Sequence, residues 1–244
     1  MPLEQKENIV KSYFETVIMG FLANDIRTLL NPDLDDIKQG GCSAPLAMIV
    51  FSGMNQLGYL TSSKETDAIA KEARTEECIK EFCNDWMGKV DSKTYRKSTI
   101  QDIMVSFFRH GLAHQFISIA LSAITRDSKQ KTLISVHTNV DGSKLYVLQV
   151  KILAQDFLKA LDLVDQKIRT AEANDPGFLI RFYKRLSDQR QRHLKNNDSL
   201  FQKADKNIVT VLDDTELCTT TTSVSTCISG EASITIDRSF DFSK

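Results

Sequence analysis

The segment RHGLAH, residues 109–114, places one arginine and two histidines inside a mostly apolar stretch, IMVSFFRHGLAHQFISIAL. An imidazole titrates near neutral pH and is also a common metal ligand. A guanidinium is a permanent cation whose forked N–H groups fit a phosphate. These residue types suit a solvated helix surface, a metal site, or an enzyme that transfers protons beside a bound phosphate.

The first two of these interpretations rest on spacing alone. Arg109, His110 and Gln115 fit the exposed face of an ordinary helix, because such a face usually carries a few polar residues. His110 and His114 are four residues apart, which points two imidazoles from one helical face at one ion. No glutamate follows the first histidine and no third ligand is close in the sequence. We therefore expect no metal and no other cofactor.

The element that carries RHGLAH is predicted to be a helix over residues 95–121, with the segment in its middle. Its apolar residues recur at three- and four-residue steps and form a wide face. Before it, residues 44–60 are almost wholly apolar and predict a central buried helix, with Ser43 as N-cap and Pro45 in the first turn.

The remaining chain predicts further helices and one hairpin. Helical spacing recurs over residues 3–30 and 63–90, the second broken near Thr75, and again around residues 157–168 and 178–186. The β-branched and aromatic runs TLISVHTN and KLYVLQV flank an Asp-Gly pair, which predicts a β-hairpin over about 132–151. The fold class is therefore mainly α with a hairpin insertion.

The C-terminal segment differs in composition from the rest. Residues 197–244 are polar and rich in Ser and Thr, with only two short strand candidates. We interpret this segment as an extension, either short strands or disordered, that follows a helical domain over residues 1–196.

Charge and hydropathy limit the partners. With 244 residues, 41% of them hydrophobic, the chain can bury a full core, and its formal net charge of -1 provides no overall basic field for nucleic acid. A local basic group on the helix after residue 178 is a weak candidate for contact with an RNA backbone, although it also fits a solvated helix face. Its members are Arg181, Lys184, Arg185, Arg190 and Arg192.

The location expected from the sequence is cytoplasmic. The N-terminus lacks the pattern of a secretory signal, and the apolar stretch over residues 44–60 is short and interrupted by Asn55 and Gln56, so no membrane span is expected. The five cysteines are scattered, without CxxC pairs, which is typical of reduced thiols.

The pattern Arg-His-x-x-x-His within an apolar helix of a helical chain resembles the R-x4-6-H signature of the HEPN superfamily, the higher eukaryote and prokaryote nucleotide-binding domains. The resemblance covers residues 109–114 as a motif and residues 1–195 as a helical scheme. It implies that Arg109 and His114 are the functional pair and that His110 occupies a supporting polar position. The hairpin and the C-terminal extension would be additions to a HEPN-like bundle.

The resemblance implies a metal-independent endoribonuclease that acts as a homodimer, in a bacterial defence or toxin–antitoxin setting with an antitoxin protein as a candidate partner. The residue types fit, since attack by the RNA 2′-hydroxyl needs a base, an acid and positive charge on the phosphorane. A dimer would supply two copies of Arg109 and His114. Gly111, costing roughly 1 kcal/mol inside a helix, suggests that another backbone packs closely there, as at a dimer interface.

A non-catalytic HEPN-like module that binds nucleotide, RNA or a protein partner is the alternative. The presence of both Arg109 and His114 favours the enzyme.

Overall fold

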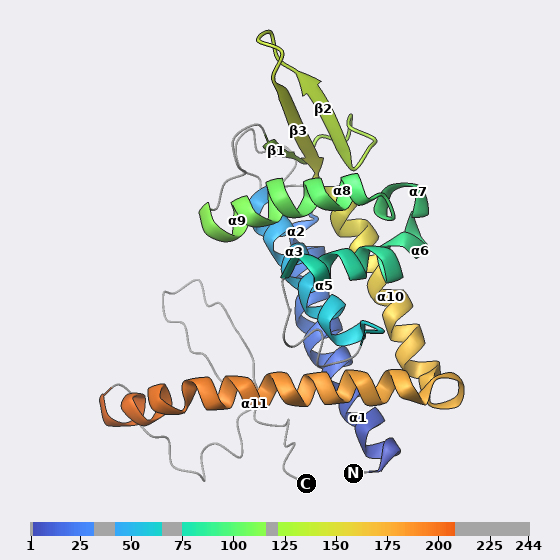
Figure 1. The fold of residues 1–244 in the computed structure, drawn as a ribbon, viewed down its shortest axis with the longest axis vertical. Helices are drawn as coiled ribbons and strands as arrows, with labels where there is room; N and C mark the ends of the chain where they lie inside the picture. Colours follow the sequence, from blue (N-terminus) through green and yellow to red (C-terminus); the bar gives the residue numbers. More distant parts are fainter. Residues whose placement is uncertain (1, 32–41, 65–74, 116–121, 208–244) are drawn as a thin grey trace. The chain divides into compact units, whose positions relative to one another are not determined.

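The computed structural model describes residues 2–31, 42–64, 75–115 and 122–207 (Figure 1). Within these ranges, the side chains at 75, 113–115, 172, 193–194 and 196–207 are outside the description. The chain divides into two compact units, residues 1–187 and 188–244. The first is mainly helical with a small three-stranded sheet, and the described part of the second is helical.

The N-terminal helix is continuous but changes its winding. It runs through α1 (Leu3–Tyr13), the π-helical segment η1 (Phe14–Leu22) and α2 (Ala23–Leu29). This confirms the helix predicted over residues 3–30, whereas the π-helical winding in its middle was not predicted. Its buried stripe comprises Val10, Phe14, Ile18, Ala23 and Ile26.

The central helix α3 (Ser43–Thr61) is the buried helix that the apolar run predicts. The prediction that Ser43 is the N-cap is wrong. The cap is Cys42, which adopts a left-handed conformation with φ 55° and makes no side-chain capping bond.

The helix predicted over residues 63–90 is described from Thr75 on, where it runs without a break to Val90, and residues 65–74 lie outside the described part. Its segments are α5 (Thr75–Phe82), the π-helical η3 (Cys83–Met87) and α6 (Gly88–Val90), followed by α7 (Ser92–Tyr95). Asp91 caps α7 by accepting hydrogen bonds from the backbone N–H groups of Lys93 and Thr94. The cap explains why the chain turns here, before the helix that carries RHGLAH.

That helix consists of α8 (Ser98–Ile103), the π-helical η4 (Met104–Arg109) and α9 (His110–Gln115). The sequence predicted one helix over residues 95–121. In the structure Tyr95 belongs to α7 instead, and residues 116–121 lie outside the described part. RHGLAH starts at the last π-helical residue and ends one residue before the end of α9.

A small sheet follows, with strands β1 (Ser122–Thr125), β2 (Ile134–Thr138) and β3 (Lys144–Gln149) in the order β1-β3-β2. The antiparallel pair β2–β3 confirms the predicted hairpin, and Gly142 in its turn has φ 81°, which glycine adopts without strain. The sequence missed β1, which pairs in parallel with β3.

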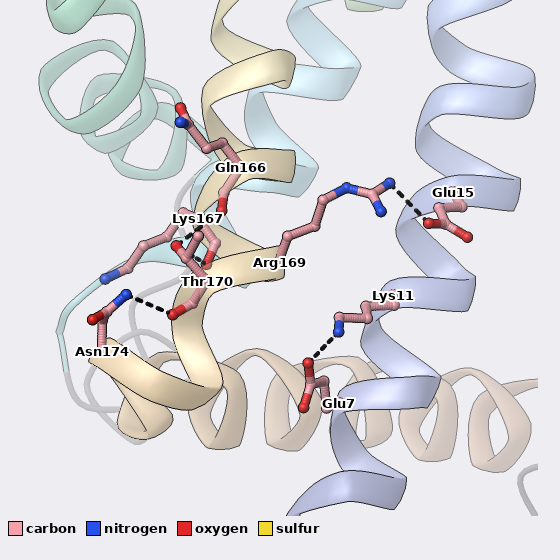
Figure 2. A network of polar contacts seen from close by, with 8 residues as sticks. All are labelled: Glu7, Lys11, Glu15, Gln166, Lys167, Arg169, Thr170 and Asn174. Carbon is pink, nitrogen blue, oxygen red and sulfur yellow. Dashed lines mark hydrogen bonds and ion pairs between the residues drawn. The ribbon is translucent and has the colours of Figure 1, made fainter.

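Two long helices complete the described chain, α10 (Val150–Asn174) and α11 (Pro176–Asn207). Figure 2 shows how α10 is joined to the N-terminal helix: Arg169 bonds Glu15 on η1 at 2.8 Å. Arg169 also bonds Asp165 on its own helix at 2.7 Å. Both ion pairs are partly exposed and contribute little stability compared with the apolar contacts between the helices.

The division between the two units falls within α11, at residues 187 and 188. The predicted boundary at residue 196 lies further along the same helix. From residue 208 on, the Ser- and Thr-rich segment is outside the described residues. No helix in the described ranges has the length and hydropathy needed to cross a membrane.

Candidate functional site

The RHGLAH segment is held by apolar side chains on the turns around it. Met104, Val105, Phe108 and Leu112 are buried, and α9 packs against α3. The backbone N–H of His110 bonds the carbonyl of Val105, five residues earlier, and this bond closes the last π-helical turn. Arg109 and His110 are therefore fixed at the junction of η4 and α9, with both side chains half-buried.

Arg109, His110 and Glu76 form a chain of hydrogen bonds. Arg109 Nη1 lies 3.1 Å from His110 Nδ1, and His110 Nε2 lies 2.8 Å from Glu76 Oε1 on α5. A guanidinium has no acceptor atom, so Nδ1 of the imidazole must accept from it. The proton of the ring is then on Nε2, which donates to the carboxylate. The geometry therefore favours a neutral His110 in the Nε2–H tautomer.

This series of hydrogen bonds orients the guanidinium of Arg109. Glu76 fixes the tautomer and the plane of the His110 ring, and the ring fixes Arg109 through its lone pair. The His110 and Glu76 side chains are 33% and 42% exposed, so the chain lies at the surface and adds little to stability. In the described part of the protein, Arg109 makes no other side-chain hydrogen bond. Its remaining N–H groups are available to an anion.

His114 is placed by its backbone alone. It lies in α9, five residues after Arg109, which on an ideal α-helix is a rotation of about 140°. Its side chain is outside the description. The structure thus brings together Arg109 and His110, two of the three predicted residues, and leaves the pairing of Arg109 with His114 as a prediction.

Gly111 lies inside the unit of residues 1–187. It is buried within the chain, next to the buried Leu112, on a helix that packs against α3. Its place at an interface with a second copy stays a prediction.

The basic group predicted on α11 is not one surface. Arg185 is buried, and its guanidinium donates to the carbonyls of Tyr59 at 2.8 Å and Ser62 at 2.7 Å, and also to that of Lys64. A phosphate has no access to it, so the assignment of Arg185 to an RNA groove is wrong.

The other members of that group are nearer the surface. Lys184 is exposed and Arg181 is half-buried, both in the unit of residues 1–187. Arg190 and Arg192 are exposed in the unit of residues 188–244. Their role as RNA ligands stays a prediction.

Sequence reasoning missed Glu76. It precedes His110 by 34 residues and lies among other charged residues of the predicted helix over 63–90. Nothing in the local pattern distinguishes it from its neighbours.

For metals, the described ranges hold no group of three His, Cys, Asp or Glu side chains placed to bind an ion.

Comparison with protein-family models, with curated proteins and with solved structures finds no match to this chain.

Proposed function

We propose that this protein is a metal-independent endoribonuclease of HEPN type that cleaves RNA at a site formed by two copies of the chain. The observation that supports the proposal is the Glu76–His110–Arg109 chain, because it holds a guanidinium at the surface within the very motif that suggested the chemistry. Elsewhere in the unit, Arg185 shows the contrasting case of a buried guanidinium whose two Nη groups donate to backbone carbonyls of the fold.

In the proposed reaction, the RNA 2′-hydroxyl loses its proton to a base as its oxygen bonds phosphorus. The bond from phosphorus to the 5′-oxygen then breaks, and that oxygen takes a proton from an acid, leaving a 2′,3′-cyclic phosphate and a 5′-hydroxyl. Arg109 binds the phosphorane oxygens, and His114 transfers protons. His110 and Glu76 are positioning residues that act through Arg109.

Two copies are proposed because base and acid are both required. One chain supplies one His114, whereas a two-fold axis supplies two imidazoles and two guanidinia to one scissile phosphate. The bacterial defence or toxin–antitoxin setting, with an antitoxin as protein partner, belongs to the same proposal.

The competing function is a HEPN-like module that binds nucleotide, RNA or a protein partner without cleavage. The available N–H groups of Arg109 favour it as much as they favour the enzyme, because an anion receptor needs no proton transfer. The two functions differ in whether His114 matters to the RNA.

The experiment compares RNA cleavage in EDTA by the wild type, His114→Ala and the control variant Arg27→Ala, with melting temperatures on the same preparations. Arg27 is an exposed arginine on α2 that bonds only Asn24 in the described structure. We expect cleavage to 2′,3′-cyclic ends by the wild type and the control, and about a 10²-fold loss in His114→Ala. A wild type that binds RNA but never cuts it would make the binding module the better conclusion. Activity that zinc restores after chelation would favour a His110/His114 metal site.

A further inference from the structure

A polar cavity in the unit of residues 1–187 shares no residue with the Arg109 motif. It is open, has a volume of about 380 Å³, and is lined from the end of α3, from η3, α6, α10 and the start of α11, and by Arg96 after α7. This volume lies in the range of cavities that hold small ligands, about 300 to 1,000 Å³.

The charges lining this cavity are not balanced. Four cationic side chains, Lys89, Arg96, Lys167 and Arg181, line it together with two carboxylates. Lys167 is paired with one of them, Asp175, at 2.9 Å. For Lys89, Arg96 and Arg181, the described residues provide no carboxylate at ion-pair distance. The cavity therefore carries an excess of positive charge.

Two of the cations show the cost of this arrangement. Nε of Arg181 is buried and has no hydrogen-bond partner in the described structure, which is unfavourable for a charged donor. Burial lowers the pKa of Lys89, and the neighbouring cations Lys167 and Arg96 lower it further, against the opposing effect of Asp85. An anion in the cavity would reduce the repulsion among these cations.

Contacts among the lining residues and with residues behind them fix the walls of the cavity. Trp86 Nε1 donates to Thr61 Oγ1 at 2.8 Å, and Gln101 Nε2 donates to Asn84 Oδ1 at 2.7 Å, which leaves the Asn84 NH₂ group as a donor. Gly88 makes room for Arg96, since a Cβ at position 88 would lie 2.8 Å from its Cγ. Walls that are already fixed in this way lower the cost of binding.

We propose that this cavity binds a small phosphorylated molecule, a phosphate monoester or a diphosphate, with Arg96 and Arg181 as its main ligands. Guanidinium groups bind phosphate oxygens in pairs of parallel hydrogen bonds.

A small ligand fits better than an RNA chain. The carboxylates of Asp85 and Asp175 line the same cavity and would repel a continuous polyanion. The Trp86 ring is covered, by Lys89 at 4.1 Å and by the edge of Phe178 at 6.3 Å, so it is no platform for stacked bases. The inference is independent of the proposed ribonuclease, because it uses neither Arg109 nor His110 nor His114.

The test is calorimetric titration of the full chain with inorganic pyrophosphate, for the wild type, Arg96→Gln, Arg181→Gln and the control Arg27→Gln. Arg96 is exposed and makes no hydrogen bond within the described residues, so its replacement leaves the fold intact. We expect each cavity variant to bind at least about tenfold more weakly, as is typical of a lost charged hydrogen bond, and the control to bind like the wild type.

Three results would overturn the proposal. The first is a wild type that binds no pyrophosphate at millimolar concentration, and the second is equal binding by Arg96→Gln and the wild type. In the third, the cavity variants weaken binding of a single-stranded RNA that pyrophosphate does not displace, which would assign the cavity to RNA. None of these readouts depends on RNA cleavage, so failure of the ribonuclease proposal leaves them interpretable.

Discussion

Arg109 and Arg185 are both arginines set among apolar residues of long helices, yet the fold places them in opposite environments. Arg185 is buried and donates to three backbone carbonyls at and just after the end of α3. Arg109 is half-buried and bonds one imidazole, which is itself held by Glu76. Arginine therefore stabilises the fold at position 185, whereas at position 109 it is a cation available to a ligand.

The difference lies in what accepts the guanidinium hydrogens. The last carbonyls of a helix have no partner within the helix, and Arg185 supplies donors for the region where α3 ends. The acceptor of Arg109 is a side chain that takes only one bond. Charge alone therefore does not distinguish a binding arginine from a structural one. The number of hydrogen-bond acceptors near the guanidinium does distinguish them.

The largest expected effect is on stability. Arg185→Leu should lower the free energy of unfolding by about 3 kcal/mol, because it leaves buried carbonyls without donors. For a unit of this size that corresponds to a drop in melting temperature of about 10 °C. Urea and thermal unfolding measure it, with Lys184→Leu on the exposed surface as the control. Unchanged stability together with weaker RNA binding would return Arg185 to the surface group.

At Arg109 the comparison predicts the reverse pattern, loss of activity at constant stability. Arg109→Ala should reduce RNA cleavage about 10²-fold, since it removes the charge proposed to bind the phosphorane. Arg109→Lys should cleave RNA faster than Arg109→Ala but more slowly than the wild type, because an ammonium keeps the charge and lacks the paired donors. Rates and melting temperatures are measured on the same preparations. If Arg109→Lys cleaves like the wild type, paired phosphate binding by this residue is wrong.

Much of the fold could be predicted because it depends on local patterns. Apolar spacing predicted the helix over residues 3–30 and the buried α3, and the Asp-Gly turn predicted the hairpin. Strand β1 could not be predicted in this way. It is four residues long, and its partner β3 begins 19 positions after it ends, so only the assembled sheet defines it.

The site was predicted less completely than the fold. Arg109 and His110 carry a sequence pattern, but their link to Glu76 joins two helices and leaves no local trace. The burial of Arg185, by contrast, is visible in the local sequence pattern. Arg185 lies three residues after Phe182 and seven after Phe178, on the apolar face of α11, and this spacing outweighs the residue's charge.

A smaller effect is expected from the positioning residues. His110→Ala and Glu76→Ala should each slow cleavage about fivefold, the equivalent of one hydrogen bond of roughly 1 kcal/mol that orients Arg109. Glu76→Gln should be milder, because its amide oxygen still accepts from Nε2–H of His110. The double variant should be no slower than His110→Ala alone, as for residues acting in series. Additive losses would mean that Glu76 acts independently of the imidazole.

The smallest expected effect concerns Asp175, whose side chain caps the exposed start of α11. Arg185 has the corresponding role at the buried end of α3. Asp175 precedes α11, accepts from the backbone N–H of Phe178 and pairs with Lys167. The hydrogen bond from Lys167 holds the pKa of Asp175 below its ordinary value, and the bond from Phe178 acts in the same direction.

A carboxyl with a lowered pKa stabilises the fold above its unfolded pKa of about 3.9 and loses that contribution as the pH falls through the folded value. Asp175→Asn should therefore cost less than about 1 kcal/mol at neutral pH, because the site is exposed to solvent. The melting temperatures of the two proteins should converge once the pH has fallen below the folded pKa of Asp175, where the carboxyl of the wild type is protonated. A difference that persists unchanged at this pH would show that the charge of Asp175 is not what stabilises the start of α11.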